Sequence, residues 1–140
     1  MIQRYIQSDY SQLIEIWEKS VTYTHDYVSK EDYDFIHSKL PEYFEKVDIY
    51  VYRKSGKIVA FMGISGNKME MLFCHPDYFR QGIGTAMVHY AIQFLHIKYL
   101  DVHVLNQQAL EFYKNLGFIV IGEQNHDYFG YSITHLMYNG

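Results

Sequence analysis

Apolar residues along the chain follow two different spacings. In residues 10–21 they recur every three or four positions, which predicts a helix with one apolar face. In residues 49–53 and 57–65 they are dense and rich in β-branched and aromatic types, which predicts two strands joined by a hairpin turn at Ser55-Gly56. By the same criteria we expect strands at Ile2–Ile6, Met69–Cys74, Tyr99–Leu105, Phe118–Gly122 and Tyr131–Tyr138, and helices at Gly82–Leu95 and Asn106–Leu116.

Polar and conformationally restricted residues mark the ends of the helices. Ser8 or Asp9 can cap the helix at residues 10–21 by accepting a hydrogen bond from its first turn. Ser29 is the corresponding cap of a second helix, which we expect to run through residue 40. Pro41 is expected to end or kink that helix, because proline has no N–H and its ring clashes with the preceding turn. Gly117 is expected to end the last helix.

The order of these elements is β-α-α-β-β-β-α-β-α-β-β, and helices alternate with strands in the second half. This order indicates an α/β chain (mixed α+β) in which a mixed sheet is covered on both faces. The length of 140 residues predicts one domain, residues 1–140. Apolar residues make up 49% and charged residues 20%, a balance that is typical of globular rather than disordered chains.

The composition argues against several classes of protein. The single cysteine, Cys74, excludes a disulfide framework and a Cys-rich zinc site, and it fits a reduced, cytoplasmic location. No apolar run approaches the roughly 18 residues of a membrane span, and the N-terminus lacks the pattern of a signal peptide. A net charge of −4 argues against a nucleic-acid partner. The eight histidines form no metal-binding motif, so we expect no metal.

Residues 71–87 combine a strand, a turn and a Gly-x-Gly step that leads directly into an amphipathic helix. The first turn of a helix presents unpaired N–H groups, and Gly82 and Gly84 let an anion approach the backbone. The segment therefore predicts a phosphate or pyrophosphate site, although the same glycines are typical of a tight strand-to-helix turn. Two common phosphate motifs are excluded. Thr85 follows Gly84 where a Walker loop has lysine, and Met87 stands where the dinucleotide fingerprint has glycine or alanine.

A second segment, residues 106–118, has the pattern of an amphipathic helix with a glycine stop. Ala109, Phe112, Tyr113 and Leu116 share one face of this helix. Tyr113 places a hydroxyl on that apolar face, and a buried hydroxyl needs a hydrogen-bond partner.

Together, and in this order, the two segments resemble the GNAT family of N-acetyltransferases. The first carries Leu72-Phe73-Cys74-His75-Pro76 followed by Gly82-Ile83-Gly84, and the second carries Asn106, Ala109, Phe112, Tyr113, Gly117 and Phe118. Residues 24–26, 59–63 and 127–130 also look familial, so the resemblance covers almost the whole chain. The chain most resembles the small, single-domain, bacterial-type members of the family. It implies the GNAT fold, a central mixed, mostly antiparallel sheet of about seven strands flanked by about four helices.

The resemblance implies acetyl-CoA as co-substrate. The pantetheine arm is expected along the strand at residues 72–74, the pyrophosphate on the N–H groups of residues 81–85, and Asn106 beside the arm. The family usually has Arg or Gln where this chain has Phe79, so we expect Arg80 to supply the side-chain contact. The expected cofactor-binding residues are Leu72, Phe73, Cys74, Arg80, Gln81, Gly82, Ile83, Gly84, Thr85, Asn106, Ala109, Phe112 and Tyr113.

The reaction implied by the resemblance is direct transfer of an acetyl group from acetyl-CoA to a primary amine in a ternary complex. Tyr113 is expected to donate a proton to the leaving thiolate, and a strand N–H around Phe73 to stabilise the oxyanion. Glu70 is the preferred base, because the two-residue period of a strand places it on the same face as Leu72.

Histidines provide alternative candidates for the base. His25 is the main rival of Glu70, and His103 and His135 on late strands are weaker candidates. The family builds its substrate pocket near the connection between the first two helices. The expected substrate-site residues are therefore His25, Trp17 and Asp26.

Two other functions stay open on the sequence alone. One is a non-catalytic acyl-CoA-binding sensor or scaffold module, and the other is an interaction domain. Aromatic residues make up 18% of the chain, but such residues fill cores more often than they line sites. The expected partner is a small amine or an amine of a peptide or protein, with no membrane. Tyr131–Tyr138 is expected to be an edge strand, so that a homodimer is plausible.

Overall fold

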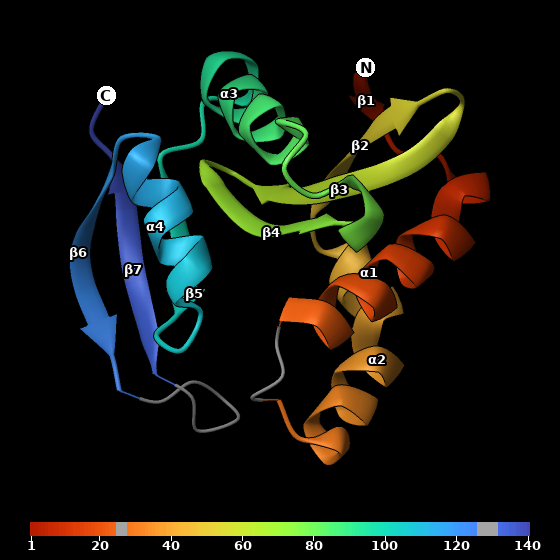
Figure 1. Ribbon diagram of the computed structural model, residues 1–140, viewed down its shortest axis with the longest axis horizontal. Helices are drawn as coiled ribbons and strands as arrows, with labels where there is room; N and C mark the ends of the chain where they lie inside the picture. The colour runs from red at the N-terminus through yellow and green to blue at the C-terminus, as the bar shows by residue number, and fades with distance from the viewer. Residues whose placement is uncertain (25–27, 126–131) are drawn as a thin grey trace.

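The computed structural model describes residues 1–24, 28–125 and 132–140, which fold around one seven-stranded sheet (Figure 1). The strand order is β1-β2-β3-β4-β5-β7-β6, and every neighbouring pair is antiparallel except β4 with β5. The strands are β1 (Ile2–Arg4), β2 (Asp48–Lys54), β3 (Lys57–Ser65), β4 (Lys68–Cys74), β5 (Tyr99–His103), β6 (Phe118–Gln124) and β7 (Ile133–Tyr138). The helices are α1 (Tyr10–Thr24), α2 (Lys30–Glu45), α3 (Ile83–Leu95) and α4 (Gln107–Asn115), with short 3-10 turns η1 (Gln7–Asp9) and η2 (Pro76–Tyr78). The mixed, mostly antiparallel architecture expected from the sequence is confirmed.

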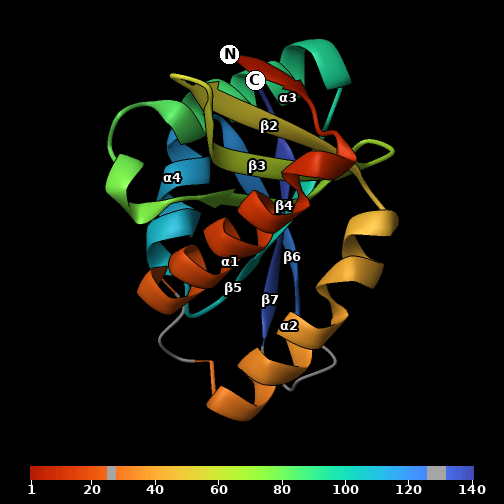
Figure 2. The same ribbon diagram turned by 90° about the vertical axis from the view of Figure 1, so that its right-hand side faces the viewer.

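Helices cover both faces of the sheet, and each face has its own apolar core. On one face α1 and α2 bury Leu13, Trp17 and Phe44 against β2 and β3, and Figure 2 shows both helices on the near side of these strands. On the other face α3 and α4 contribute Met87 and Tyr113 to a second cluster. Within the described residues, no helix is long and apolar enough to cross a membrane.

β4 and β5 are parallel neighbours only at their first residues. The register pairs Lys68 with Tyr99 and Met69 with Leu100, and no further pair joins the two strands in the described part of the chain. Figure 1 shows them running apart beyond this point. The two central strands therefore splay apart, which leaves one side of the later half of β4 without a neighbouring strand.

β7 is not an edge strand, so that expectation is wrong. It lies between β5 and β6 and pairs antiparallel with both, and the edge on this side of the sheet is β6. After β6 the chain returns into the middle of the sheet, where residues 133–138 form hydrogen bonds with β5 on one side and with β6 on the other. The proposed pairing of this strand with a second subunit is excluded by that arrangement.

Pro41 does not end the second helix, because α2 continues to Glu45. Leu40 and Phe44 flank the proline and are only 2% and 6% exposed in the core beneath α1. Burial of these two side chains offsets the single hydrogen bond that the missing N–H removes.

The expected cap of α2 and the expected glycine stop of α4 are confirmed, and Asn106 is found to cap α4. The Ser29 hydroxyl accepts a hydrogen bond of 3.1 Å from the N–H of Asp32 at the start of α2. The Asn106 side-chain oxygen accepts one of 3.1 Å from the N–H of Ala109 at the start of α4. Gly117, just past the end of α4, has φ of +105°, a conformation that favours glycine.

Candidate active site

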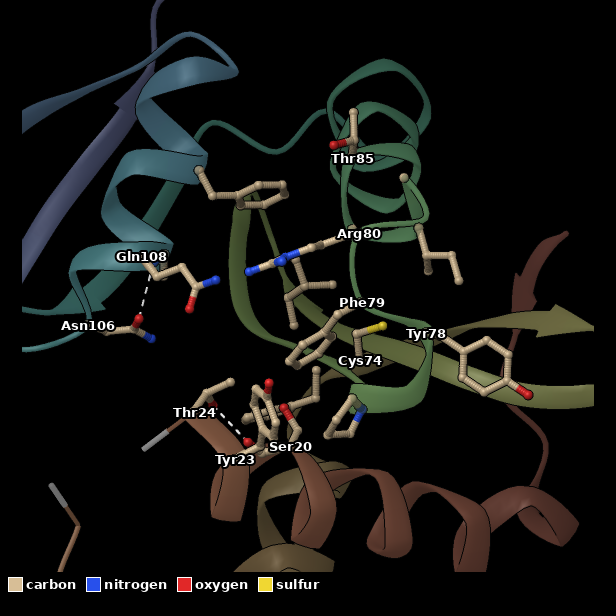
Figure 3. Close-up of a pocket in the computed structure, with 18 of the residues that line it drawn as sticks. Ser20, Tyr23, Thr24, Cys74, Tyr78, Phe79, Arg80, Thr85, Asn106 and Gln108 are labelled. Carbon is tan, nitrogen blue, oxygen red and sulfur yellow. Dashed lines mark hydrogen bonds between the residues drawn. The ribbon is translucent and has the colours of Figure 1, made fainter. Parts of the chain in front are cut away.

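A cavity of about 570 Å³ opens where β4 separates from β5 (Figure 3). β4, the turn that follows it, the first turn of α3, the start of α4 and the last turn of α1 all contribute to its walls. Its lining residues are Ser20, Tyr23, Thr24, Leu72, Phe73, Cys74, Pro76, Tyr78, Phe79, Arg80, Gly82, Ile83, Gly84, Thr85, Asn106, Gln108, Ala109, Phe112 and Tyr113. Every residue that the sequence predicted to contact acetyl-CoA lines this cavity, except Gln81.

The two glycines of the Gly-x-Gly step have different structural roles. Gly82 is the N-cap of α3 and has φ of +80°, which an L side chain rarely adopts. Gly84 lies inside α3, where an added Cβ would stand 3.3 Å from Cζ of Phe112 on α4. The first glycine therefore sets the turn, and the second lets α3 and α4 approach closely. The first N–H groups of a helix have no intrahelical partners, no side chain caps those of α3, and the residues that carry them line the cavity.

The turn before α3 presents one cation to the cavity. Arg80 has φ of +63°, a conformation that costs a non-glycine residue free energy. Figure 3 shows its side chain reaching across the cavity toward Gln108. Phe79 instead makes an edge-to-face contact with Tyr23 at the end of α1, with ring centroids 5.3 Å apart. The Gln81 side chain is held outside the cavity, where its oxygen accepts a hydrogen bond of 2.6 Å from Lys54.

The backbone of β4 directs two N–H groups into the gap beside β5. The N–H of His75 donates to the carbonyl of Val59 on β3 at 2.9 Å. Because successive residues of a strand point their N–H groups to opposite sides, those of Cys74 and Leu72 point away from β3. The donors available to a ligand in the gap are therefore the neighbours of Phe73 rather than Phe73 itself.

Tyr113 lies on the inner face of α4, where it is 9% exposed. Its ring packs edge-on against Phe112 and Phe118, at centroid distances of 5.0 and 5.7 Å. Burial raises the pKa of Tyr113 above its ordinary value, so the hydroxyl stays protonated throughout the neutral range.

A second cavity of about 320 Å³ adjoins the first. The two share Leu72, Phe73, Asn106, Ala109 and Tyr113 in their linings, so Tyr113 stands at their boundary. The residues that line only the second cavity come from α1, the residues just before α2, the middle of α2, β4 and β5. They are Trp17, Val21, Val28, Ile36, Met69, Glu70, Met71, Leu100, Asp101, Val102 and His103.

Glu70 lines the second cavity, but it does not share a face with Leu72, so that expectation is wrong. The register against β3 slips between Gly63, which pairs with Met71, and Ile64, which pairs with Met69. Glu70 is the extra residue of this bulge, and the bulge interrupts the two-residue alternation. Leu72 packs in the cluster beneath α3, whereas Glu70 pairs with Lys68 on the opposite face.

Glu70 belongs to a chain of ionic contacts across three strands. The Lys68 ammonium lies 3.1 Å from the Glu70 carboxylate and 2.8 Å from that of Asp101 on β5. Asp101 also meets Nδ1 of His135 on β7 at 2.6 Å. Partial burial acts to raise the pKa of Asp101, but its hydrogen bonds with Lys68 and His135 outweigh this and hold the pKa below its ordinary value.

The remaining predicted residues fall into three groups. Trp17, 3% exposed, is part of the second cavity's wall. His25 and Asp26 lie outside the described residues. Burial raises the pKa of the Cys74 thiol to about 11, which is unfavourable for a nucleophile.

Among the described residues, no group of three or more His, Cys, Asp or Glu side chains is arranged to hold a metal ion.

Sequence reasoning missed several lining residues. Tyr23, which contacts Phe79 across the first cavity, lies in the last turn of a helix that was recognised only for its buried stripe. Asp101 follows from strand alternation, since it stands between the buried residues Leu100 and Val102. That alternation indicated an outward-facing carboxylate, but not that β4 would bring Lys68 and Glu70 beside it.

Comparison with known proteins agrees with this geometry. Residues 45–120 match the family model described as an acetyltransferase (GNAT) domain. The chain is 31% identical to the peptidyl-lysine N-acetyltransferase YjaB of Escherichia coli over 99% of this chain and 97% of that protein. The solution structure of apo-form YjaB covers 100% of this chain and 97% of its own, with a TM-score of 0.89 and 31% identity.

A more distant structure has the same fold. The PaiA N-acetyltransferase of Thermoplasma acidophilum, solved in complex with coenzyme A, has a TM-score of 0.74 at 22% identity. It covers 99% of this chain and 98% of its own. The family model and the full-length relative together show that this chain belongs to the GNAT family of acetyltransferases.

Proposed function

We propose that this acetyltransferase moves the acetyl group of acetyl-CoA to the side-chain amine of a lysine in a peptide or protein, by direct transfer with both substrates bound. The observation that carries the proposal is the meeting of two cavities at Tyr113. The names of the relatives YjaB and YiaC, both peptidyl-lysine N-acetyltransferases, support lysine as the acceptor.

The larger cavity fits acetyl-CoA by its chemistry. The unpartnered N–H groups at the start of α3 and the Arg80 guanidinium suit a pyrophosphate. The N–H groups of Leu72 and Cys74, which point into the gap beside β4, suit carbonyl oxygens of the pantetheine arm and of its thioester. When bound, acetyl-CoA supplies a thioester whose acyl group an amine can take.

The smaller cavity fits the acceptor. Its walls are mostly apolar, with Trp17, Ile36 and Leu72 among them, and they suit the aliphatic stem of a lysine side chain. Glu70 and Asp101 add two carboxylates that suit an ammonium group.

Three groups of this chain carry the chemistry in the proposal. Glu70, on the acceptor side, accepts the proton that the ammonium must lose before it can attack. An N–H of β4 beside Phe73 stabilises negative charge on the carbonyl oxygen. Tyr113, kept protonated by its burial, donates a proton to the leaving sulfur. Holding both substrates at this boundary removes much of the entropic barrier.

The test is incubation of the protein with acetyl-CoA and a lysine peptide whose N-terminus is blocked. The proposal predicts free thiol release and a mass gain of one acetyl group on the peptide. The matched control is the same peptide with norleucine in place of lysine, which keeps the aliphatic stem and removes the amine. Thermal stabilisation by acetyl-CoA without acetylation of any amine would instead favour a sensor or scaffold module.

A further inference from the structure

The acceptor cavity has an excess of negative charge. Of the described residues that line it, Glu70 and Asp101 are acidic and none is a lysine or arginine. Both carboxylates are partly shielded from solvent, with side chains 35% and 28% exposed. At such sites a charge is screened less than on an open surface, so the net charge of the cavity matters for which amine enters.

A lysine of the chain itself already occupies the space between these carboxylates. The Lys68 ammonium is within hydrogen-bond distance of both, 3.1 Å from Glu70 and 2.8 Å from Asp101. Lys68 and Glu70 are two residues apart on β4 and so share a face, and the parallel register of Lys68 with Tyr99 brings β5 alongside. Lys68 does not itself line the cavity.

Lys68 keeps its charge at this place. Burial acts to lower the pKa of Lys68, but the hydrogen bonds to Asp101 and Glu70 more than offset this effect and raise it. The local count for Glu70, Asp101 and Lys68 is therefore two negative charges and one positive charge, a net charge of −1. Without Lys68 the same carboxylates would present −2.

We propose that Lys68 is a specificity-determining residue. It reduces the net charge of the acceptor cavity from −2 to −1, which matches the charge of one ammonium. Lys68 thereby favours a lysine side chain over a diamine or polyamine as acceptor. This inference rests on the proposed function. A dication gains more than a monocation from each unit of negative charge near its site. Lys68 therefore disfavours the dication without contacting either acceptor, and selectivity arises from repulsion rather than from a new contact.

The experiment compares two acceptors that share an aliphatic stem. Nα-acetyl-lysine amide carries one ammonium, and 1,5-diaminopentane carries two. The values of kcat/KM for both acceptors are measured in the wild type and in Lys68→Met at a single pH. We expect the ratio of diamine to monoamine to rise roughly tenfold in Lys68→Met, and the rise to shrink as salt is added.

Two control variants separate this effect from others. Lys68→Arg keeps the charge and should keep the wild-type ratio. Lys57→Met makes the same change in net charge at the exposed start of β3 and should also leave the ratio unchanged. The inference would be overturned, and the proposed function would stand, if Lys68→Met kept the wild-type ratio of diamine to monoamine. An equal shift of that ratio in Lys57→Met would have the same meaning. A wild-type protein that acetylates neither acceptor nor the lysine peptide would overturn the proposed function and the inference with it.

Discussion

Gly84 of α3 lies directly against Phe112 of α4, close enough that a Cβ at position 84 would stand 3.3 Å from the ring. These residues belong to the two sequence segments that first pointed to acetyl transfer. Their contact fixes the distance between α3 and α4, and thereby the width of the larger cavity that both helices line. A side chain at position 84 would require the Phe112 ring to shift by a few tenths of an ångström.

Substitution of Gly84 by alanine should therefore affect ligand binding more than stability. Alanine favours the helix by about 1 kcal/mol relative to glycine, which offsets the crowding of Phe112. The displaced ring narrows the cavity, and we expect the Kd for acetyl-CoA to rise at least about tenfold. Calorimetric titration together with thermal unfolding measures both effects. A matched control is Ala86→Gly, also in the first turns of α3, which should lower stability and leave the Kd unchanged.

Substitution of Arg80 should also weaken binding without lowering stability. Its positive φ is costly for arginine and free of strain for glycine, so we expect Arg80→Gly to unfold at the same or a higher temperature. Loss of the guanidinium should weaken acetyl-CoA binding by roughly tenfold or more, the value of a charge-assisted hydrogen bond. Arg80→Lys, which keeps both the charge and the strain, serves as the control. Undiminished affinity in Arg80→Gly would exclude this side chain from the phosphate site.

Asp101 should make stability depend on pH in a defined direction. Its pKa is lower in the folded chain, because contacts with Lys68 and His135 outweigh the effect of burial. The unfolded chain therefore binds more protons as the pH falls, and the stabilisation present at neutral pH is lost on acidification. The free energy of unfolding of the wild type should exceed that of Asp101→Asn at pH 7. The difference should begin to shrink near pH 4, at about the ordinary pKa of an aspartate, and vanish below the folded pKa.

The control for this pH dependence is Asp48→Asn. The Asp48 carboxylate is 63% exposed and lies 3.5 Å from Arg4, so the substitution should change stability little at any pH. A difference between the wild type and Asp101→Asn that stays constant from pH 7 to pH 3 would contradict a role for the ionised carboxylate.

The elements of the fold could be predicted because their signals are local. The caps at Ser29 and Asn106, and the glycine at the end of α4, act within one helical turn. The continuation of α2 through Pro41 could not be predicted, because the burial of Leu40 and Phe44 against distant strands is not a local property.

The parts of the site that escaped prediction depend on pairing between strands. Glu70 does not share a face with Leu72 because a bulge forms against β3, and a single sequence carries no sign of that register slip. β7 lies inside the sheet because β6 returns beside it, and counting residues along the chain does not reveal this order. The lining residues of the larger cavity were found more fully, because the two motifs that supply most of them were recognised by resemblance.

The central claim is that Tyr113, at the boundary of the two cavities, donates the proton that completes acetyl transfer. The most direct measurement is kcat and the Kd for acetyl-CoA in Tyr113→Phe, which keeps the buried ring against Phe112 and Phe118 and removes only the hydroxyl. We predict an unchanged Kd and a kcat lower by roughly 10- to 1,000-fold, the usual contribution of general acid catalysis. A kcat equal to that of the wild type would contradict this role of Tyr113.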